Sequence, residues 1–185
     1  HKDRLCCFVL RNLTPMIKMT TTYISLGCNQ GVRIENLHKA TLEIQKKVGT
    51  IKRASSIYET PAWGFEGPDF LNACLCVHTE LSAEELLTQL LEIEISMGRV
   101  RSSELKYTSR SIDLDVLFYA DQIISTEFLT VPHPRLALRN FILFPMAEIA
   151  PNWVDPKLEK SILELLAASP DKSIPKRLGE ELSVK

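Results

Sequence analysis

The stretch FLNACLCVHTELSAEELLTQLLEIEISMG, residues 70–98, changes its hydrophobic period halfway along and so indicates the fold. In its first part, apolar residues recur at every second position from Leu71 to Val77, as in a strand with one face in a core. Ser82 and Glu85 then form the capping-box pattern that begins a helix, and the leucine-rich run after them ends at a glycine. This stretch therefore predicts a strand that leads into an amphipathic helix.

The segments on either side repeat this succession of strands and helices. The predicted strands are residues 22–27, 50–61 and 111–120, and the predicted helices are residues 32–49, 133–151 and 158–168. With residues 70–98, the order is β-α-β-β-α-β followed by helices, which is the ferredoxin-like succession. We therefore expect an α+β fold with an antiparallel sheet, helices mainly on one face, and additional C-terminal helices.

Length and composition restrict the class of protein. The chain has 185 residues, which suffices for one domain with a substantial core and is too short for two. Its formal net charge of -1 argues against a nucleic-acid binder that works through a global basic field. No apolar run approaches the roughly 20 residues of a membrane helix. We expect a cytoplasmic monomer with one active site that binds neither nucleic acid nor a membrane.

The two ends of the chain differ from its middle. Residues 1–18 show neither a strand nor a helix period, and methionines follow at positions 16 and 19. We expect the native product to begin at Met16 or Met19, with residues 1–18 as a non-native or disordered extension. Residues 19–168 would form the single domain, and the polar residues 169–185 a mobile tail.

The cysteines predict reduced thiols. There are five, an odd number, and none of them shows the C-x-x-C spacing of a zinc site. Cys74 and Cys76 share one face of the predicted strand. We expect them to be buried as small apolar side chains.

A second stretch, SRSIDLDVLFY at residues 109–119, places two aspartates inside an otherwise apolar strand. Alternation sends Asp113 and Asp115 to one face, roughly 7 Å apart, while their neighbours point to the core. Two like charges on a half-buried surface are costly unless a cation or an arginine offsets them. Mg²⁺ binds one or two carboxylates together with substrate phosphates, and two such ions about 4 Å apart serve phosphoryl transfer. The alternative is a solvated face or an ion pair with Arg110.

Basic residues near this pair favour a phosphate site. They are Arg99, Arg101, Arg110, His133, Arg135 and Arg139. Arginine binds phosphate oxygens with two parallel hydrogen bonds, so arginines beside carboxylates suit a magnesium–polyphosphate site. Ordinary surface ion pairs are the alternative for each arginine taken singly. His133 could equally be structural or a phosphate or ribose contact.

The stretch TPAWGFEGPDFLNA, residues 60–73, predicts an ordered loop that carries aromatic side chains near the sheet edge. Trp63, Phe65 and Phe70 with the Asn72 amide suit a flat heteroaromatic ligand, by stacking and by hydrogen bonds to its edge. Core packing is the alternative for Phe70 and for Phe141. The chain lacks the P-loop motif and the G-x-S-x-G motif, so neither that nucleotide site nor hydrolase chemistry is predicted.

Six blocks of sequence, in their order along the chain, together resemble the 6-hydroxymethyl-7,8-dihydropterin pyrophosphokinase family of folate biosynthesis. The blocks are YISLGCNQG (23–31), SSIYETPAWG (55–64), PDFLNACLCVHTEL (68–81), IEISMGRVR (93–101), RSIDLDVLFY (110–119) and VPHPRLALRNFILFPMAEIAP (131–151). The resemblance covers about residues 22–168, so that residues 19–168 would be the pyrophosphokinase domain. It implies Mg²⁺-dependent transfer of the pyrophosphoryl group of ATP to the pterin hydroxymethyl oxygen, giving AMP and the pterin diphosphate.

The resemblance also implies roles for single residues. Asp113 and Asp115 match the aspartates that bind two Mg²⁺ ions. The pterin-side positions are Thr60, Pro61, Trp63, Phe70, Asn72 and Phe141, with the two phenylalanines on either side of the ring. Arg99, Arg110 and His133 match phosphate-contacting positions, and Arg139 a mobile or product-side arginine. Glu94, Arg101, Ile112 and Thr130 fall on the ATP side.

Some positions depart from the family pattern. Thr108-Ser109 stands where a Gly-Pro pair is common, and Tyr107 where a tryptophan is frequent. This loop closes over substrate in the family, so these departures bear on its closure and on its ATP contacts. Cys28 replaces a frequent serine. The length leaves no room for the second folate enzyme sometimes fused to the family, so we expect a single activity.

Two other functions remain open from the residues. Another D-x-D metal-dependent nucleotide or glycosyl transferase would share the aspartate pair but would not bind a pterin. A non-catalytic ferredoxin-like binding module would carry both aspartates as surface groups and would bind no nucleotide with Mg²⁺.

Overall fold

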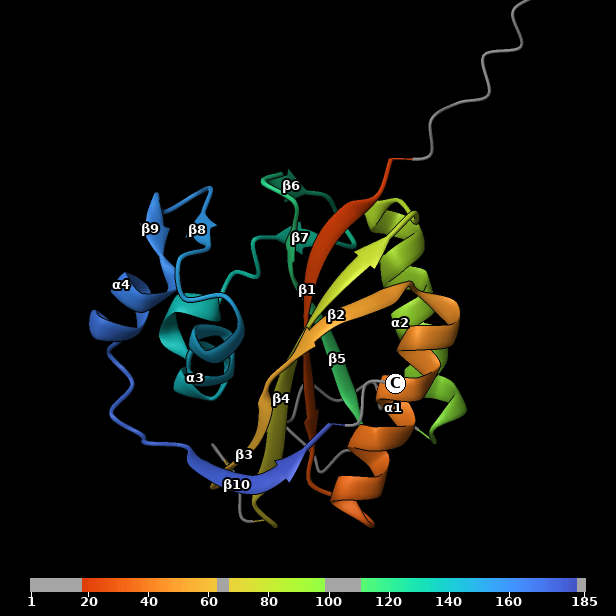
Figure 1. The fold of residues 1–185 in the computed structure, drawn as a ribbon, viewed down its shortest axis with the longest axis vertical. Helices are drawn as coiled ribbons and strands as arrows, with labels where there is room; N and C mark the ends of the chain where they lie inside the picture. The colour runs from red at the N-terminus through yellow and green to blue at the C-terminus, as the bar shows by residue number, and fades with distance from the viewer. Residues whose placement is uncertain (1–17, 63–66, 99–110, 183–185) are drawn as a thin grey trace, which may run out of the picture.

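The computed structural model describes residues 18–62, 67–98 and 111–182. An antiparallel sheet lies between two layers of helix (Figure 1). Its strands are β1 (Thr20–Cys28), β2 (Thr50–Ala54), β3 (Ser56–Thr60), β4 (Phe70–Thr79), β5 (Asp113–Tyr119) and β10 (Lys176–Glu181). The helices are α1 (Arg33–Lys47), α2 (Ala83–Ser96), α3 (Asn140–Ile149) and α4 (Ile162–Ala167), with a 3-10 turn η1 (Leu136–Leu138). Two short hairpins pair β6 (Ile124–Ser125) with β7 (Thr130–Val131) and β8 (Val154–Asp155) with β9 (Lys160–Ser161).

The sheet has the order β10-β3-β4-β1-β5, and β2 also pairs with β4. Every pairing is antiparallel. The central strand β1 pairs with β4 on one side and β5 on the other, so that Gly27 lies between Asn72 and Asp113. This register brings segments far apart in sequence into one row across the sheet.

The two faces of the sheet carry separate apolar clusters. Side chains such as Leu26 and Leu114 pack with α1 and α2. Side chains such as Cys74 and Leu117 pack with α3 and α4 on the other face. The prediction of helices mainly on one face is therefore wrong, because the C-terminal helices are strongly apolar and cover the second face.

The predicted strand–helix unit of residues 70–98 is confirmed. Strand β4 places alternate residues in the cluster under α1 and α2, and α2 begins at the predicted capping box. Ser82 Oγ accepts a hydrogen bond from the Glu85 N–H, and the Glu85 carboxylate accepts one from the Ser82 N–H at 2.8 Å. These bonds satisfy two of the N–H groups that a helix start leaves without partners in the helix.

Two other predictions need correction. The single strand predicted for residues 50–61 is two strands, which meet at Ser55; its hydroxyl accepts a hydrogen bond from the Cys74 N–H at 2.9 Å. The polar tail predicted to be mobile contains β10, which pairs with β3 at the edge of the sheet. An exposed edge strand can be largely polar, so composition alone did not reveal it. None of the helices in the described residues is long and apolar enough to cross a membrane.

Candidate active site

The aspartate pair lies on the sheet face that α3 partly covers. Ile112, Leu114 and Val116 point into the core under α1 and α2, as the alternation predicts. Asp113 and Asp115 therefore point the other way, and both are partly exposed. Their cross-strand neighbours on β1 are Gly27, which has no side chain, and Ser25, which has a small one, so there is room beside the two carboxylates. The strand thus presents a pair of carboxylates at one edge of this face.

A polar and aromatic group occupies the same face on the neighbouring strands. Asn72 is buried on β4, and its Nδ2 donates a hydrogen bond to Thr60 Oγ1 on β3 at 2.9 Å. Phe70 pairs with Thr60 across these strands and lies on the same side. A Cβ atom at Gly27 would lie 3.3 Å from Asn72 Oδ1, so the glycine allows the amide to sit over β1. An amide, a hydroxyl and a phenyl ring thus adjoin the carboxylate pair.

The start of α3 adds a second aromatic ring and a cation. The Arg139 guanidinium carbon lies 5.4 Å from the centroid of the Phe141 ring, a cation–π contact. Both residues are partly exposed. The expected pterin-side residues are thus divided between the end of the sheet and the first turn of α3.

His133 lies among charges of both signs. Burial first, and the nearby Arg139 and Arg135 after it, together lower its pKa from 6.5 to about 4 against the opposing effect of Asp113. The Arg135 N–H donates to His133 Nδ1 at 3.3 Å, which leaves the imidazole proton on Nε2. At neutral pH, His133 is therefore an uncharged hydrogen-bond donor near the carboxylates, suited to an anionic oxygen.

A cavity of about 210 Å³ adjoins Asp115 between α2, β5 and the β6–β7 hairpin. Its lining residues are Leu87, Leu114, Asp115, Val116, Phe128, Leu129, Thr130, His133 and Pro134. The walls are mostly apolar, while Asp115, Thr130 and His133 supply polar groups at the side of the aspartate pair. A larger cavity of about 290 Å³, between η1 and α4, includes none of the predicted site residues.

Two predicted ATP-side residues are deeply buried. Ile112 packs in the core under α1 and α2. Glu94 Oε1 accepts a hydrogen bond from the Leu114 N–H at 2.7 Å, so Glu94 supports the strand between the two aspartates. Their contacts with a nucleotide stay a prediction, as does that of the exposed Thr130. The contact of the exposed Pro61 with the pterin also stays a prediction.

The other predicted residues lie outside the described residues. They are Trp63, Phe65, Arg99, Arg101, Tyr107, Thr108, Ser109 and Arg110. The described residues therefore contain the aspartates, His133, Arg139 and most of the pterin-side group, but not the predicted arginines before β5.

The residues that strand pairing brings beside the aspartates could not be predicted from the sequence. Gly27 is predicted only as the last residue of a strand, although its place beside Asn72 and Asp113 shapes this face. The apolar walls of the smaller cavity, such as Leu87 and Leu129, were also missed. No local motif signals them, because they come together only through long-range pairing.

The donor set fits Mg²⁺ better than zinc. Among the described residues, no group of three His, Cys, Asp or Glu side chains could hold a metal ion. Mg²⁺ needs only one or two carboxylates when water and phosphate oxygens complete its shell. Burial raises the pKa of the Cys28 thiol to about 12 and that of Cys74 above its usual range, so neither offers a thiolate. The described cysteines Cys28, Cys74 and Cys76 are buried free thiols, as predicted.

Comparison of the chain with known proteins identifies a matching family. The family model for 7,8-dihydro-6-hydroxymethylpterin-pyrophosphokinase (HPPK) matches residues 23–151. Two relatives carry the name 2-amino-4-hydroxy-6-hydroxymethyldihydropteridine pyrophosphokinase. The one from Synechocystis is 42% identical over 144 residues, which span 77% of this chain and 73% of the relative. The one from Aquifex aeolicus is 40% identical over 147 residues, which span 79% of this chain and 90% of the relative.

Solved structures show the same fold. Wild-type HPPK-DHPS from Plasmodium falciparum superposes with a TM-score of 0.66 at 17% identity, over 81% of this chain and 44% of that one. The A437G variant of the same protein has a TM-score of 0.68 at 16% identity, over 83% of this chain and 46% of that one. The chain spans less than half the length of these structures. They support the arrangement of antiparallel sheet and helices described above.

Proposed function

The chain belongs to the 7,8-dihydro-6-hydroxymethylpterin-pyrophosphokinase family, and from this premise we propose that it is an ATP-dependent diphosphotransferase of folate biosynthesis. It transfers the pyrophosphoryl group of ATP to the hydroxymethyl oxygen of 6-hydroxymethyl-7,8-dihydropterin. The observation that supports this most is the register of the sheet. Asp113 on β5 and Asn72 on β4 both pair with Gly27 of β1, which lies between them. The carboxylate and the amide therefore lie in one row on the same face of the sheet.

The reaction needs no nucleophile from the protein. The substrate hydroxyl attacks the β-phosphorus of ATP, a new P–O bond forms, and the bond between the β-phosphorus and the oxygen of the α-phosphate breaks. AMP leaves with that electron pair, and the proton of the hydroxyl is released to water. Catalysis then consists of positioning the two substrates and offsetting negative charge.

Asp113 and Asp115 would hold magnesium, and two ions are proposed. When bound, Mg²⁺ neutralises charge on the triphosphate oxygens. The carboxylates project from an edge strand that pairs with β1 along six positions, so their backbone is fixed. Neutral His133 donates from Nε2 to a phosphate oxygen and adds no positive charge of its own. Arg139 supplies a cation on the same side.

The smaller cavity suits the nucleobase of ATP. Its apolar walls match the faces of a flat ring, and Thr130 and His133 add polar groups to its lining. Asp115 lines the same cavity, so a nucleotide placed there extends its phosphates toward the aspartate pair.

The pterin is assigned to the other side of the aspartates. Asn72 and Thr60 present an amide and a hydroxyl to the polar edge of the ring, and Phe70 and Phe141 present their rings to its faces. This arrangement favours a pterin over the alternative of a general D-x-D nucleotide transferase, which would need no such group.

The finer structural expectations also remain our proposals. The order β3-β4-β1-β5 with two helices over one face supports a ferredoxin-like topology for the central unit. We also propose that the enzyme is cytoplasmic and works as a monomer.

Formation of AMP that depends on the pterin tests the function. We expect Asp113→Asn and Asp115→Asn each to lower kcat by at least about 100-fold, the usual cost of losing a preorganised charge-stabilising group. Asp121→Asn makes the same chemical change at an exposed position after β5 and should leave activity unchanged. Wild-type protein that forms no AMP with the pterin, or an Asp113→Asn variant with full activity, would overturn the proposal.

A further inference from the structure

The C-terminal segment, residues 169–182, runs from the end of α4 past α3 to the edge of the sheet, where β10 pairs with β3 (Figure 1). It contacts two elements that carry predicted pterin-side residues: α3, which begins beside Arg139 and Phe141, and β3, which ends at Thr60. One set of contacts lies at the start of α3, and the other, with different side chains, lies where the end of α3 meets β3.

The first contact is at the start of α3. The Asp171 carboxylate accepts a hydrogen bond from the Asn140 N–H at 2.8 Å. The buried Asn140 side chain donates in return to the backbone carbonyls of Asp171 at 2.9 Å and Ser173 at 2.7 Å. A carboxylate at a helix start satisfies an N–H without a helical partner and complements the positive end of the helix dipole. Asn140 lies between Arg139 and Phe141, so this contact fixes the backbone that carries both.

The Asp171 carboxylate is itself held from two sides. The Ser173 N–H donates to its other oxygen at 2.8 Å. Burial alone would raise the pKa of Asp171, but hydrogen bonds from the backbone of Asn140 and from Ser173 lower it below its usual value. The group is therefore charged at neutral pH and tightly connected to α3.

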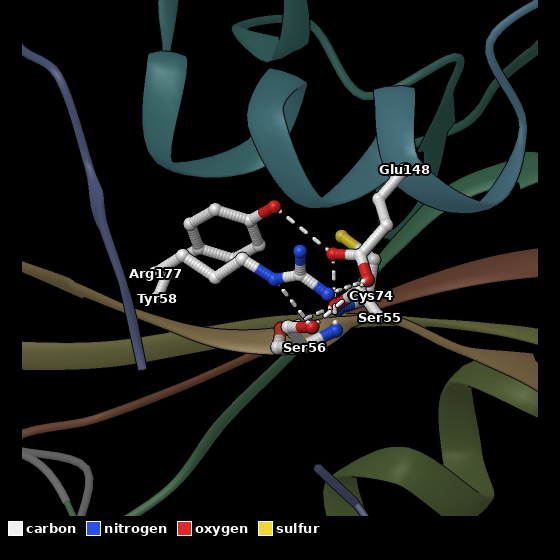
Figure 2. Close-up of polar contacts among 6 residues, drawn as sticks. All are labelled: Ser55, Ser56, Tyr58, Cys74, Glu148 and Arg177. Atoms are coloured by element: carbon white, nitrogen blue, oxygen red, sulfur yellow. Dashed lines mark hydrogen bonds and ion pairs between the residues drawn. The ribbon is translucent and has the colours of Figure 1, made fainter. Parts of the chain in front are cut away.

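The second contact is at the end of α3, where Arg177 of β10 meets Glu148 (Figure 2). Arg177 Nη2 lies 3.3 Å from Glu148 Oε1, and Arg177 Nε donates to Ser56 Oγ at 2.9 Å. The Glu148 carboxylate also accepts hydrogen bonds from the Ser56 N–H at 3.1 Å, the Ser56 hydroxyl at 2.9 Å and the Tyr58 hydroxyl at 2.9 Å. One carboxylate thus joins α3, β3 and β10.

The position of Glu148 explains why it needs these donors. A carboxylate in the last turn of a helix is repelled by the negative end of the dipole. Burial and the nearby Glu148 carboxylate raise the pKa of Tyr58 to about 12, so the phenol keeps its proton and donates. The four hydrogen bonds on Glu148 offset the unfavourable position and hold the end of α3 against β3.

The contacts on β3 extend toward the pterin-side group. Ser56, Tyr58 and Thr60 lie on one face of this strand because residues two apart share a face. Tyr58 pairs with Asn72 across the strands, and Thr60 accepts the hydrogen bond of the Asn72 amide. A shift of β3 against α3 would therefore move Thr60 and Asn72 relative to Phe141.

We propose that the C-terminal segment positions the pterin-binding wall, with Asp171 setting the start of α3 and Arg177, through Glu148, setting β3. This inference rests on the proposed function. Asp171 and Arg177 are positioning residues, because their contacts are with α3 and β3. An isolated surface ion pair contributes little to stability, and the Arg177 side chain is 60% exposed. The expected effect is therefore on substrate placement.

Steady-state kinetics with each substrate varied in turn tests the proposal. We expect Arg177→Ala and Asp171→Ala to raise KM for the pterin by about tenfold, since small misplacements are costly, and to change KM for ATP less than twofold. Arg177→Lys keeps a charge near Glu148 but lacks the guanidinium Nε that donates to Ser56. Its KM for the pterin should therefore lie between those of the wild type and Arg177→Ala. Asp171→Asn keeps an acceptor, so its KM for the pterin should likewise lie between those of the wild type and Asp171→Ala.

Matched controls separate positioning from folding. Lys176→Ala and Glu180→Ala change exposed residues of the same strand and should leave both KM values unchanged. A merely structural role would lower the midpoint of thermal unfolding and the folded fraction, and hence the apparent kcat, while KM for the pterin stayed constant. If an alanine variant fails to fold, Arg177→Lys and Asp171→Asn carry the test.

The outcomes distinguish this inference from the proposed function. An active wild type whose variants keep an unchanged KM for the pterin, or show equal rises in both KM values, overturns the inference alone. A wild type that forms no AMP with the pterin overturns the proposed function and, with it, this inference.

Discussion

His133 shows how the environment of one residue decides its chemical form. Its folded-state pKa of about 4 lies below the ordinary value of 6.5, because burial and the flanking Arg139 and Arg135 outweigh Asp113. Between these two pH values the unfolded chain binds a proton that the folded chain does not. The stability that the uncharged His133 contributes is therefore fully present above pH 6.5 and is lost as pH falls toward 4.

This behaviour gives a prediction for stability against pH. Denaturant unfolding at pH 4.5 and pH 7.5 should show a smaller stability loss for His133→Asn than for the wild type, since the asparagine does not titrate. Asparagine Oδ1 can accept the hydrogen bond that the Arg135 N–H now donates to Nδ1. An equal loss in both proteins would assign the acid sensitivity to other groups.

Thr60 gives a second prediction at the residue scale. Thr60→Val keeps the shape of the side chain but removes the acceptor of the buried Asn72 amide. Leaving a buried donor unsatisfied costs about 1–3 kcal/mol, so the free energy of unfolding should fall by that amount and pterin affinity should fall with it. Thr88→Val, on the exposed surface of α2, makes the same change where water can replace the lost contact. Equal effects of both substitutions would contradict the role given to Thr60.

The residues that could be predicted from the sequence are those with local signals. Alternation alone placed Asp113 and Asp115 on one face and their neighbours in the core. It could not place Gly27 and Asn72 beside them, because register depends on the turns and on pairing along whole strands. The contact between Arg177 and Glu148 has no local signal either, since the two residues lie in different elements.

At the scale of elements, the β6–β7 hairpin forms one wall of the nucleotide-side cavity. Phe128 lies between its strands and lines the cavity although its surface is 81% exposed. An exposed aromatic ring at the rim of an apolar cavity can stack on a nucleobase. We therefore expect the hairpin to contribute to binding of ATP even though it lies outside the main sheet.

Removing this ring should weaken nucleotide binding. We expect Phe128→Ala to reduce the affinity for a non-hydrolysable ATP analogue by about 1 kcal/mol, roughly fivefold, as for loss of a base–aromatic stack. Tripolyphosphate lacks a base, so its affinity should not change. Ile123→Ala removes another exposed apolar side chain near the same hairpin but away from the cavity, and serves as control. Unchanged analogue affinity in calorimetry would contradict this role of Phe128.

The predicted and observed elements differ where tertiary contacts override composition. The capping box of α2 was predicted because both partners lie within one turn. Strand β10 was not, because four of its six residues are charged and its partner strand lies more than a hundred positions earlier. The division between β2 and β3 follows from Ser55, whose hydroxyl bonds to the backbone of β4.

At the scale of the whole molecule, the two faces of the sheet have different tasks. The face under α1 and α2 is an apolar core that holds β1, β4 and β5 in register. The opposite face carries the aspartates at one edge and the Asn72 group beside them, while α3 supplies Arg139 and Phe141. The C-terminal segment joins α3 to the far edge of the sheet. The fold thus places the proposed nucleotide and pterin sides of the site next to each other.

The central claim is that a magnesium nucleotide and a pterin meet at Asp113 and Asp115. Calorimetric titration of 6-hydroxymethyl-7,8-dihydropterin into the protein, with Mg²⁺ and a non-hydrolysable ATP analogue and then without nucleotide, tests it most directly. We predict tight pterin binding that depends on the nucleotide, and loss of that dependence in Asp113→Asn. Absence of pterin binding under both conditions would contradict the claim and leave at most a metal–nucleotide site.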